Sequence, residues 1–226
     1  MAGFRTHLGF AAGCGFGYGA AAVNPLGFPA EAAVLAAGLT AVGGMLPDLD
    51  SDSGKPVKEL FALAGAVVPL LLVPRLEQMQ VSHEGMLAFL VGCYAFVRYG
   101  LAWGLKRVTV HRGMFHSIPA MLIAGLVVYL AYWSPDRGVR LLLAGGVMLG
   151  FLSHLVLDEV YSVDFNGVRV KLKTSAGSAL KFFSPSFLGT TVCYTVLGAL
   201  LVLAYGDYRH AGGPELTLID FRFAAK

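Results

Sequence analysis

Apolar segments make up most of this chain, and seven of them are candidates for helices that cross or enter a lipid bilayer. Hydrophobic residues account for 56% of the 226 residues and charged residues for only 14%, whereas an average soluble domain is about 25% charged. A spanning helix needs about 20 mostly apolar residues, or fewer where it packs within protein. The clearest predicted spans are 85–105, 117–133, 139–157 and 187–205, and the weaker ones are 8–23, 30–46 and 60–73.

The fold class that follows is all-α: a polytopic membrane helical bundle with about five to seven transmembrane helices. No repeat of 20 to 50 residues and no linker is visible, so we expect residues 1–226 to form a single domain. The N-terminal stretch also has features of a signal peptide, with Arg5 before an apolar run and three alanines after it. That run is rich in glycine and only weakly apolar, which argues against a signal peptide.

Alternate numbering of seven spans places the N-terminus and the loops 47–59, 106–116 and 158–186 on one face of the bilayer. Ten of the 17 basic residues lie on that face, six lie on the other, and Arg98 lies inside a span. The positive-inside rule therefore predicts that this face is cytoplasmic. We expect an integral protein of a bacterial or archaeal inner (plasma) membrane.

Several function classes have no support in the sequence. The three cysteines are isolated in apolar stretches, which argues against a disulfide framework and a zinc knuckle. A net charge of +3 without a basic stripe gives no indication of nucleic-acid binding. No P-loop, dinucleotide-binding fingerprint or nucleophile elbow occurs in a supporting context.

Three short polar segments, 46–50, 111–117 and 154–158, interrupt the apolar sequence and hold three of the six histidines and three aspartates. Ionisable side chains are costly in lipid, so their presence there indicates a functional site. In the seven-span topology they fall on one face, close to helix ends, together with a histidine at the start of the chain. The candidate metal ligands are His7, Asp48, Asp50, His111, His116, His154 and Asp158.

Each segment has a metal-binding interpretation and a simpler alternative. His154 and Asp158 are four apart on a predicted helix, so they project from one face and could clamp a zinc-like ion, or form only a hydrogen-bonded helix end. Asp48 and Asp50 would face the same way in an extended turn and could share an ion, or belong to an ordinary acidic loop. His7 is equally suited to a ligand and to an interfacial residue.

The segment 111–117 combines two histidines with features of an anion site. Arg112 offers a planar fork that suits phosphate or carboxylate, and Gly113 lets the backbone approach closely. The simpler alternative is that His116 or Ser117 caps the following helix. His83 and His210 fall on the opposite face and are left out of the site.

In these motifs the chain resembles the LexA-regulated, membrane-bound metal-dependent hydrolases, a family long described as a domain of unknown function. The matching features are His7, the Leu-Pro-Asp-x-Asp segment 46–50, the His-Arg-Gly-x-x-His-Ser segment 111–117 and the Gly-x-x-Ser-His-x-x-x-Asp segment 150–158. They cover roughly residues 1–165, and the tail 206–226 carries no assigned motif. That family is distantly similar to zinc-dependent phospholipases C and single-strand-specific nucleases.

The resemblance implies hydrolysis of a phosphoester, such as a phospholipid or a related substrate, with the seven candidate residues as metal ligands. Two or three divalent ions, zinc by the mixture of His and Asp, are expected at the cytoplasmic helix ends. Arg112 would hold phosphoryl oxygens and Asp50 or Asp48 would orient water. The expected partners are the lipid bilayer and this substrate. Two alternative functions are a metal-ion transporter and a non-catalytic protein with a structural metal site.

Overall fold

Helices make up most of the structure, which is a computed structural model that describes residues 3–50, 54–101, 103, 114–161, 163–166, 169–172, 181–184 and 186–210. A two-stranded antiparallel hairpin, which the sequence patterns did not predict, follows the longest buried helix. The elements in chain order are α1 (Phe4–Val23), α2 (Ala30–Gly43), the 3-10 helix η1 (Leu46–Asp50), α3 (Gly54–Gln78), α4 (His83–Ala95), the π-helix η2 (Phe96–Leu101), α6 (Ile118–Ala131), α7 (Arg137–Val160), β1 (Val163–Asn166), β2 (Arg169–Leu172) and α8 (Phe187–His210).

Five helical segments in the described residues are long and apolar enough to cross a membrane: Ala30–Asp48, Leu60–Gln78, His83–Leu101, Arg137–Val160 and Phe187–Arg209. The apolar helix α6 has only 14 residues, about 21 Å of helix against about 30 Å of hydrocarbon. Helix α1 covers the weak predicted span 8–23 but is not among the five. The prediction of an all-α polytopic membrane bundle is confirmed.

The boundaries of two predicted segments differ from the structure. The span predicted at 85–105 is an α-helix only to Ala95 and continues as the π-helix η2 to Leu101. Helix α3 begins at Gly54, so much of the predicted loop 47–59 is helical. Pro69 and Pro74 lie inside α3, which membrane helices tolerate better than soluble ones because neighbouring groups satisfy the freed backbone.

Glycines let α2 and α7 meet at their backbones. A Cβ atom on Gly150 of α7 would overlap the carbonyl oxygen of Thr40 on α2, and a Cβ on Gly43 would overlap that of Val147. Small residues of this kind are what allows membrane helices to pack closely without a hydrophobic driving force. The buried core lies along this contact and its neighbours, at Ala22, Ala33, Ala36, Leu39, Leu71, Val128, Leu142, Leu143 and Val147.

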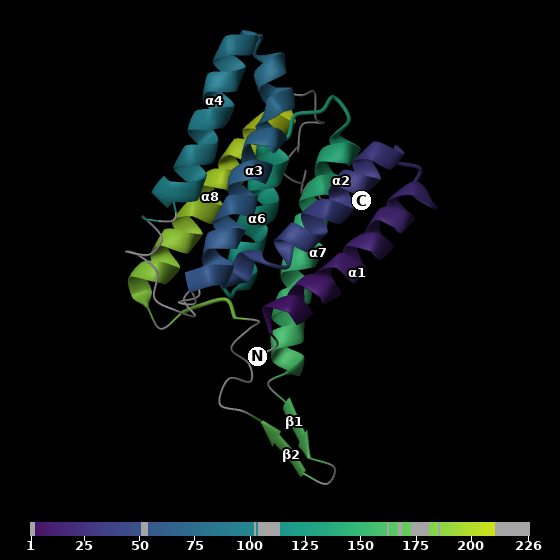
Figure 1. The fold of residues 1–226 in the computed structure, drawn as a ribbon, viewed down its shortest axis with the longest axis vertical. Helices are drawn as coiled ribbons and strands as arrows, with labels where there is room; N and C mark the ends of the chain where they lie inside the picture. Colours follow the sequence, from purple (N-terminus) through teal and green to yellow (C-terminus); the bar gives the residue numbers. More distant parts are fainter. Residues whose placement is uncertain are drawn as a thin grey trace, which may run out of the picture.

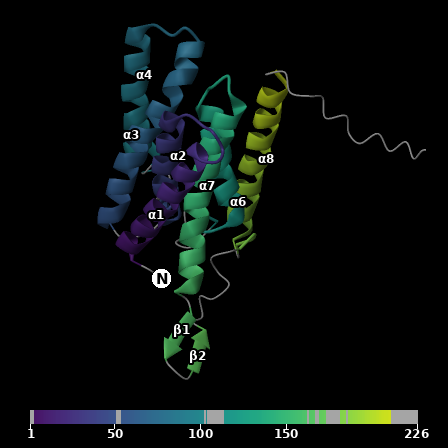
Figure 2. The same ribbon diagram turned by 90° about the vertical axis from the view of Figure 1, so that its right-hand side faces the viewer.

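The helices run alternately up and down, so their ends form two sets. The N-terminal end of α1 and the C-terminal end of α7 lie at one end of the molecule, and the hairpin β1–β2 projects beyond them (Figure 1). The connection between α3 and α4 lies at the other end, as the view turned by 90° also shows (Figure 2). Because of this arrangement, the parts of the predicted polar segments that the structure describes lie at a single end of the bundle.

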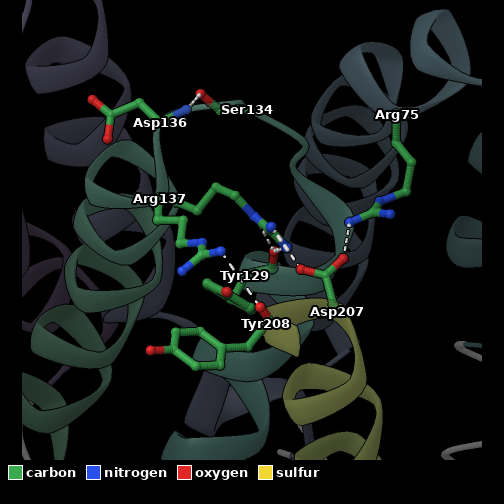
Figure 3. Close-up of polar contacts among 8 residues, drawn as sticks. Arg75, Tyr129, Ser134, Asp136, Arg137, Asp207 and Tyr208 are labelled. Carbon is green, nitrogen blue, oxygen red and sulfur yellow. Dashed lines mark hydrogen bonds and ion pairs between the residues drawn. The ribbon is translucent and has the colours of Figure 1, made fainter. Parts of the chain in front are cut away.

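The opposite end has its own polar cluster, which joins α3, α6, α7 and α8 (Figure 3). Arg75 and Arg140 both contact the carboxylate of Asp207, and Arg140 also donates to the backbone carbonyl of Tyr129. Arg137 donates to the carbonyl oxygen of Tyr208 over 3.4 Å, near the C-terminal end of α8. The two ends of the bundle therefore differ in chemistry: arginines and a carboxylate at one, histidines and carboxylates at the other.

Candidate metal centre

Five of the seven predicted metal ligands come together at the end of the bundle that carries the hairpin. They fall into two overlapping groups in which one ligand atom of each residue lies within 4.8 Å of the others. The first group is His7, His154 and Asp158, and the second is Asp48, His116 and His154. The helices α1 and α7, the 3-10 helix η1 and the segment before α6 thus contribute to one cluster, with His154 common to both groups.

The ring of His154 is held in one orientation by the backbone of α2. Its Nδ1 lies 2.7 Å from the carbonyl oxygen of Gly44, and because a carbonyl only accepts, Nδ1 must carry the proton. The Nε2 atom is therefore left with its lone pair. It faces two carboxylates, 3.8 Å from Asp48 Oδ1 and 3.7 Å from Asp158 Oδ2.

His7 stacks on this ring from α1. The two ring centroids are 3.7 Å apart with an interplanar angle of 11°, and His7 Nε2 lies 3.1 Å from Asp158 Oδ1. Both rings belong to one group of candidate ligands with Asp158, and histidine binds metals in its neutral form.

His116 completes the cluster from the segment before α6. Its ring meets that of His154 edge-on, with centroids 5.6 Å apart and an interplanar angle of 67°. The next residue, Ser117, caps α6 by accepting from the backbone of Ala120 over 3.3 Å, and Ile118 N donates to Lys181 O over 3.1 Å. The helix-cap alternative is thus correct for Ser117, while His116 points to the cluster.

Four of the five side chains are almost completely buried, and one is not. His7, His116, His154 and Asp158 are 3%, 4%, 1% and 6% exposed, whereas the side chain of Asp48 is 23% exposed. Within the described part of the chain, His154 Nε2 and His7 Nδ1 are buried without a hydrogen-bond partner. Buried polar atoms of this kind are uncommon and call for an explanation such as an ion or water.

His154 and Asp158, four residues apart on α7, project from the same face of the helix, as the sequence predicts. Their closest atoms are 3.7 Å apart, which is too far for a hydrogen bond, so the pair is not a hydrogen-bonded helix end. Asp158 instead pairs with His7, more than 100 residues away in the sequence.

The expectation for Asp48 and Asp50 is wrong in its geometry. Residues 46–50 form the 3-10 helix η1, not an extended turn. The extended backbone on which the prediction depended, with alternate residues on one side, is therefore absent. Asp48 reaches the cluster, and the side chain of Asp50 lies outside the described residues.

Two predicted site residues cannot be placed, since His111 and Arg112 both lie outside the described residues. His83, which was left out of the site, begins α4 at the opposite end of the bundle and is exposed. The side chain of His210 lies outside the described residues.

Sequence reasoning missed the residues that orient the cluster. Gly44 supplies the carbonyl group that fixes His154, and Gly150 lets α7 approach α2 closely enough for that contact. The adjacent glycines 43 and 44, one turn before Asp48, are a signal for close backbone approach. Metal-binding histidines commonly donate their second nitrogen to a backbone carbonyl or carboxylate, so Gly44 has the position of such a supporting group.

Comparison with known families agrees with the membrane character of the chain. A family model described as "YdjM inner membrane protein" matches residues 1–205. No curated protein and no solved structure is significantly similar to the chain. The match supports the membrane family that the motifs indicate, while the similarity to hydrolases stays a prediction. With its apolar spanning helices, the chain is an integral membrane protein and belongs to the YdjM inner membrane protein family.

Proposed function

We propose that this protein is a membrane-bound, metal-dependent hydrolase that acts on a phosphoester. The observation that carries the proposal is the orientation of His154, whose Nδ1 donates to Gly44 O while its Nε2 faces the carboxylates of Asp48 and Asp158. A ring fixed in this way presents its lone pair to two carboxylates, and His7 and His116 each belong to one of the two groups of candidate ligands that share His154. Such a set of ligands suits a divalent metal ion.

The residues fit zinc better than a hard cation. Calcium and magnesium prefer oxygen ligands, whereas imidazole nitrogens combined with carboxylate oxygens suit zinc and its neighbours. An ion would also provide a partner for His154 Nε2, which is buried without a hydrogen bond in the described part of the chain. The ligands would be His154 with a selection from His7, Asp48, His116 and Asp158.

The number of ions is limited by His154. Both groups of ligands use this residue, and its Nδ1 is already engaged with Gly44. One Nε2 lone pair binds one ion, so the five described residues support one ion through His154. A second or third ion, as the resemblance implies, would need further ligands, for which Asp50 and His111 remain the candidates.

A bound divalent ion would supply Lewis-acid activation of water and of a phosphoryl oxygen. The protein side chains supply the rest. Asp158 fixes His7 through the 3.1 Å contact to its Nε2, and the buried histidines keep bulk water from one side of the cluster. Asp48, which has the most exposed side chain of the five, marks the side from which substrate and water approach.

Arg112 and Asp50 keep the roles that the sequence suggests for them. Arg112 precedes His116 by four residues, so a place near the cluster is compatible with the chain length between them. Its guanidinium would hold two non-bridging phosphoryl oxygens. Asp50, two residues after Asp48, would orient the attacking water or bind a metal.

The site end of the bundle is proposed to face the cytoplasm. The basis is the predicted seven-span topology, in which ten basic residues fall on the face of the site and six on the other. The ligands lie at helix ends, whereas transporters of ions usually bind near the middle of the membrane in broken helices. This location favours a hydrolase over the alternative of a metal-ion transporter.

The test uses the full-length protein purified in detergent. Elemental analysis should find zinc in stoichiometric amount, and a chromogenic phosphodiester or a phospholipid should be hydrolysed in a metal-dependent manner. Stoichiometric metal without turnover of either substrate would identify a structural metal site instead. Metal flux into vesicles without hydrolysis would identify a transporter, and protein without metal would overturn the proposal.

A further inference from the structure

An apolar groove of about 340 Å³ lies between α1, α2 and α3, near the end of the bundle that carries the cluster of candidate metal ligands. Its walls include Phe4 and Leu8 of α1, Ala41 and Met45 at the end of α2, and Leu60 and Leu63 of α3. No charged residue and no hydroxyl group is among the described lining residues. A polar ligand would find no partner there.

The groove and the cluster of candidate metal ligands share two structural elements, the start of α1 and the segment from α2 to η1. Phe4 and Leu8, which line the groove, lie within one turn of His7 on α1. Met45, which also lines it, accepts a hydrogen bond of 3.2 Å at its carbonyl oxygen from the backbone of Asp48. A molecule in the groove is therefore next to the turns that position two of the candidate ligands.

The groove begins beside the ligands at Phe4 and extends deeper into the bundle. Ala41 comes almost two helical turns before Asp48, and Leu60 and Leu63 lie about 1.7 and 2.5 turns after the start of α3 at Gly54. An occupant that runs from the cluster into the groove would have its polar end at the helix ends and its apolar end toward the membrane interior. Lipids have this orientation in a bilayer leaflet.

We propose that the groove holds an acyl chain of the substrate, and that the substrate is a membrane lipid whose phosphoester headgroup lies at the metal cluster. This inference rests on the proposed function. Two of the three helices that form the groove are long and apolar enough to cross a membrane, and Leu63 on its wall is 36% exposed. The molecules that surround such a helix are lipids, and the volume is at the lower end of the roughly 300–1,000 Å³ typical of ligand pockets.

The groove would contribute more to the orientation of the substrate than to its binding affinity. An acyl chain that moves from the bilayer into an apolar groove exchanges one apolar environment for another, so little hydrophobic free energy is gained. The benefit is orientation, because a chain held next to His7 and Asp48 keeps the headgroup near the cluster. A water-soluble phosphodiester without an acyl chain would gain nothing from the groove.

The test fills the groove and compares two substrates. Ala41→Phe and Leu63→Trp add bulk to the walls, and the matched controls Ala88→Phe and Leu87→Trp add the same bulk at exposed positions of α4. The ratio of phospholipid hydrolysis to hydrolysis of bis-p-nitrophenyl phosphate should fall by roughly tenfold or more in each groove variant. The ratio should be unchanged in both controls, and metal content should match the wild type in all four.

A second measurement does not depend on turnover. Phosphatidylethanolamine with a diazirine in one acyl chain, reconstituted with the full chain in vesicles, should label the peptides that carry Phe4 to Leu8 and Ala41 to Met45. Labelling of these peptides should be lost in Ala41→Phe and kept in Ala88→Phe.

The outcomes separate the two proposals. Unchanged labelling and an unchanged substrate ratio in both groove variants would overturn the acyl-chain inference while leaving the hydrolase proposal intact. Labelling without hydrolysis of either substrate in the wild type would overturn the hydrolase proposal, and the groove would then be a lipid site without a role in substrate binding. Hydrolysis of the soluble diester alone would also overturn the lipid inference.

Discussion

The guanidinium group of Arg140 on α7 lies 2.6 Å from the carboxylate of Asp207 on α8, at the end of the bundle opposite the candidate metal ligands. Arg140 is 2% exposed, and its Nε and Nη2 atoms donate to Tyr129 O over 3.2 and 2.9 Å. Arg75 of α3 reaches the same carboxylate over 3.3 Å (Figure 3). One aspartate therefore joins α8 to two other helices.

Replacing Asp207 should loosen this end of the bundle. Asp207→Asn keeps the size of the side chain but leaves the buried charge of Arg140 without its counter-ion, which we expect to cost about 2–3 kcal/mol of folding stability. The expected result is a lower midpoint of thermal unfolding in detergent. Asp136→Asn is the matched control, because Asp136 caps α7 through Gly138 N and asparagine caps a helix equally well. Equal midpoints for the two variants would contradict the role given to Asp207.

The contact between α2 and α7 should be sensitive to a single methyl group. Gly150→Ala places a Cβ where the carbonyl oxygen of Thr40 lies, so the helices must separate, at a cost of about 1–3 kcal/mol. Separation would also move Gly44 away from His154. We therefore expect lower thermal stability together with lower metal content.

Gly198→Ala on α8 serves as the control for this substitution, since a Cβ there has no atom within 4 Å. It should leave both the unfolding midpoint and the metal content unchanged. A Gly150→Ala protein with wild-type metal content would show that the close approach of the two helices is not needed for the site.

Metal content should depend on the clustered residues and not on the other histidines. His154→Ala and Asp158→Ala each remove a candidate ligand, so each should lower the metal content of the purified protein. His83→Ala and His210→Ala, outside the cluster, should retain it. If all four variants bind the same amount of metal, the ligand assignment is wrong.

The sequence was sufficient to predict the helices and the gathering of the described candidate ligands at one end of the bundle. The predicted spans fall on the helices because apolar runs bounded by loops are the strongest signal a membrane chain contains. The hairpin β1–β2 was not predicted because its two strands have only four residues each. The length of α6 was overestimated, since Ser117 begins it as a cap and Tyr132 ends it.

The sequence predicted which residues belong to the candidate site, but not which of them contact one another. Asp158 pairs with His7, and His154 with the backbone of Gly44. Neither pair has a local sequence signal, because the first depends on how α1 packs on α7 and the second on how α2 packs on α7. The extended turn predicted for Asp48 and Asp50 is wrong, because the local backbone is a 3-10 helix. Every residue has a backbone carbonyl oxygen that can accept a hydrogen bond, so the sequence alone could not identify that of Gly44 as the partner of His154.

The topology of the site end can be tested by labelling. Single cysteines at Ser53, Thr109 and Ser162, placed in a chain whose native Cys14, Cys93 and Cys193 are replaced, should react with an impermeant reagent from the same side. We expect that side to be the cytoplasm, because the positive-inside rule applies to these loops. A cysteine at Gln80, in the connection between α3 and α4, should react from the other side. Reaction of the first three positions from different sides would break the single-site arrangement.

Arg112→Lys should separate catalysis from metal binding. Lysine keeps the positive charge but cannot make the two-pronged contact of a guanidinium to phosphoryl oxygens. Contacts that form in the transition state are commonly worth about 3 kcal/mol, so phosphodiester hydrolysis should fall roughly a hundredfold while metal content and unfolding midpoint stay at wild-type values. Arg107→Lys, in the same loop but outside the matching motif, should retain activity. Full activity in Arg112→Lys would show that Arg112 does not contact the substrate.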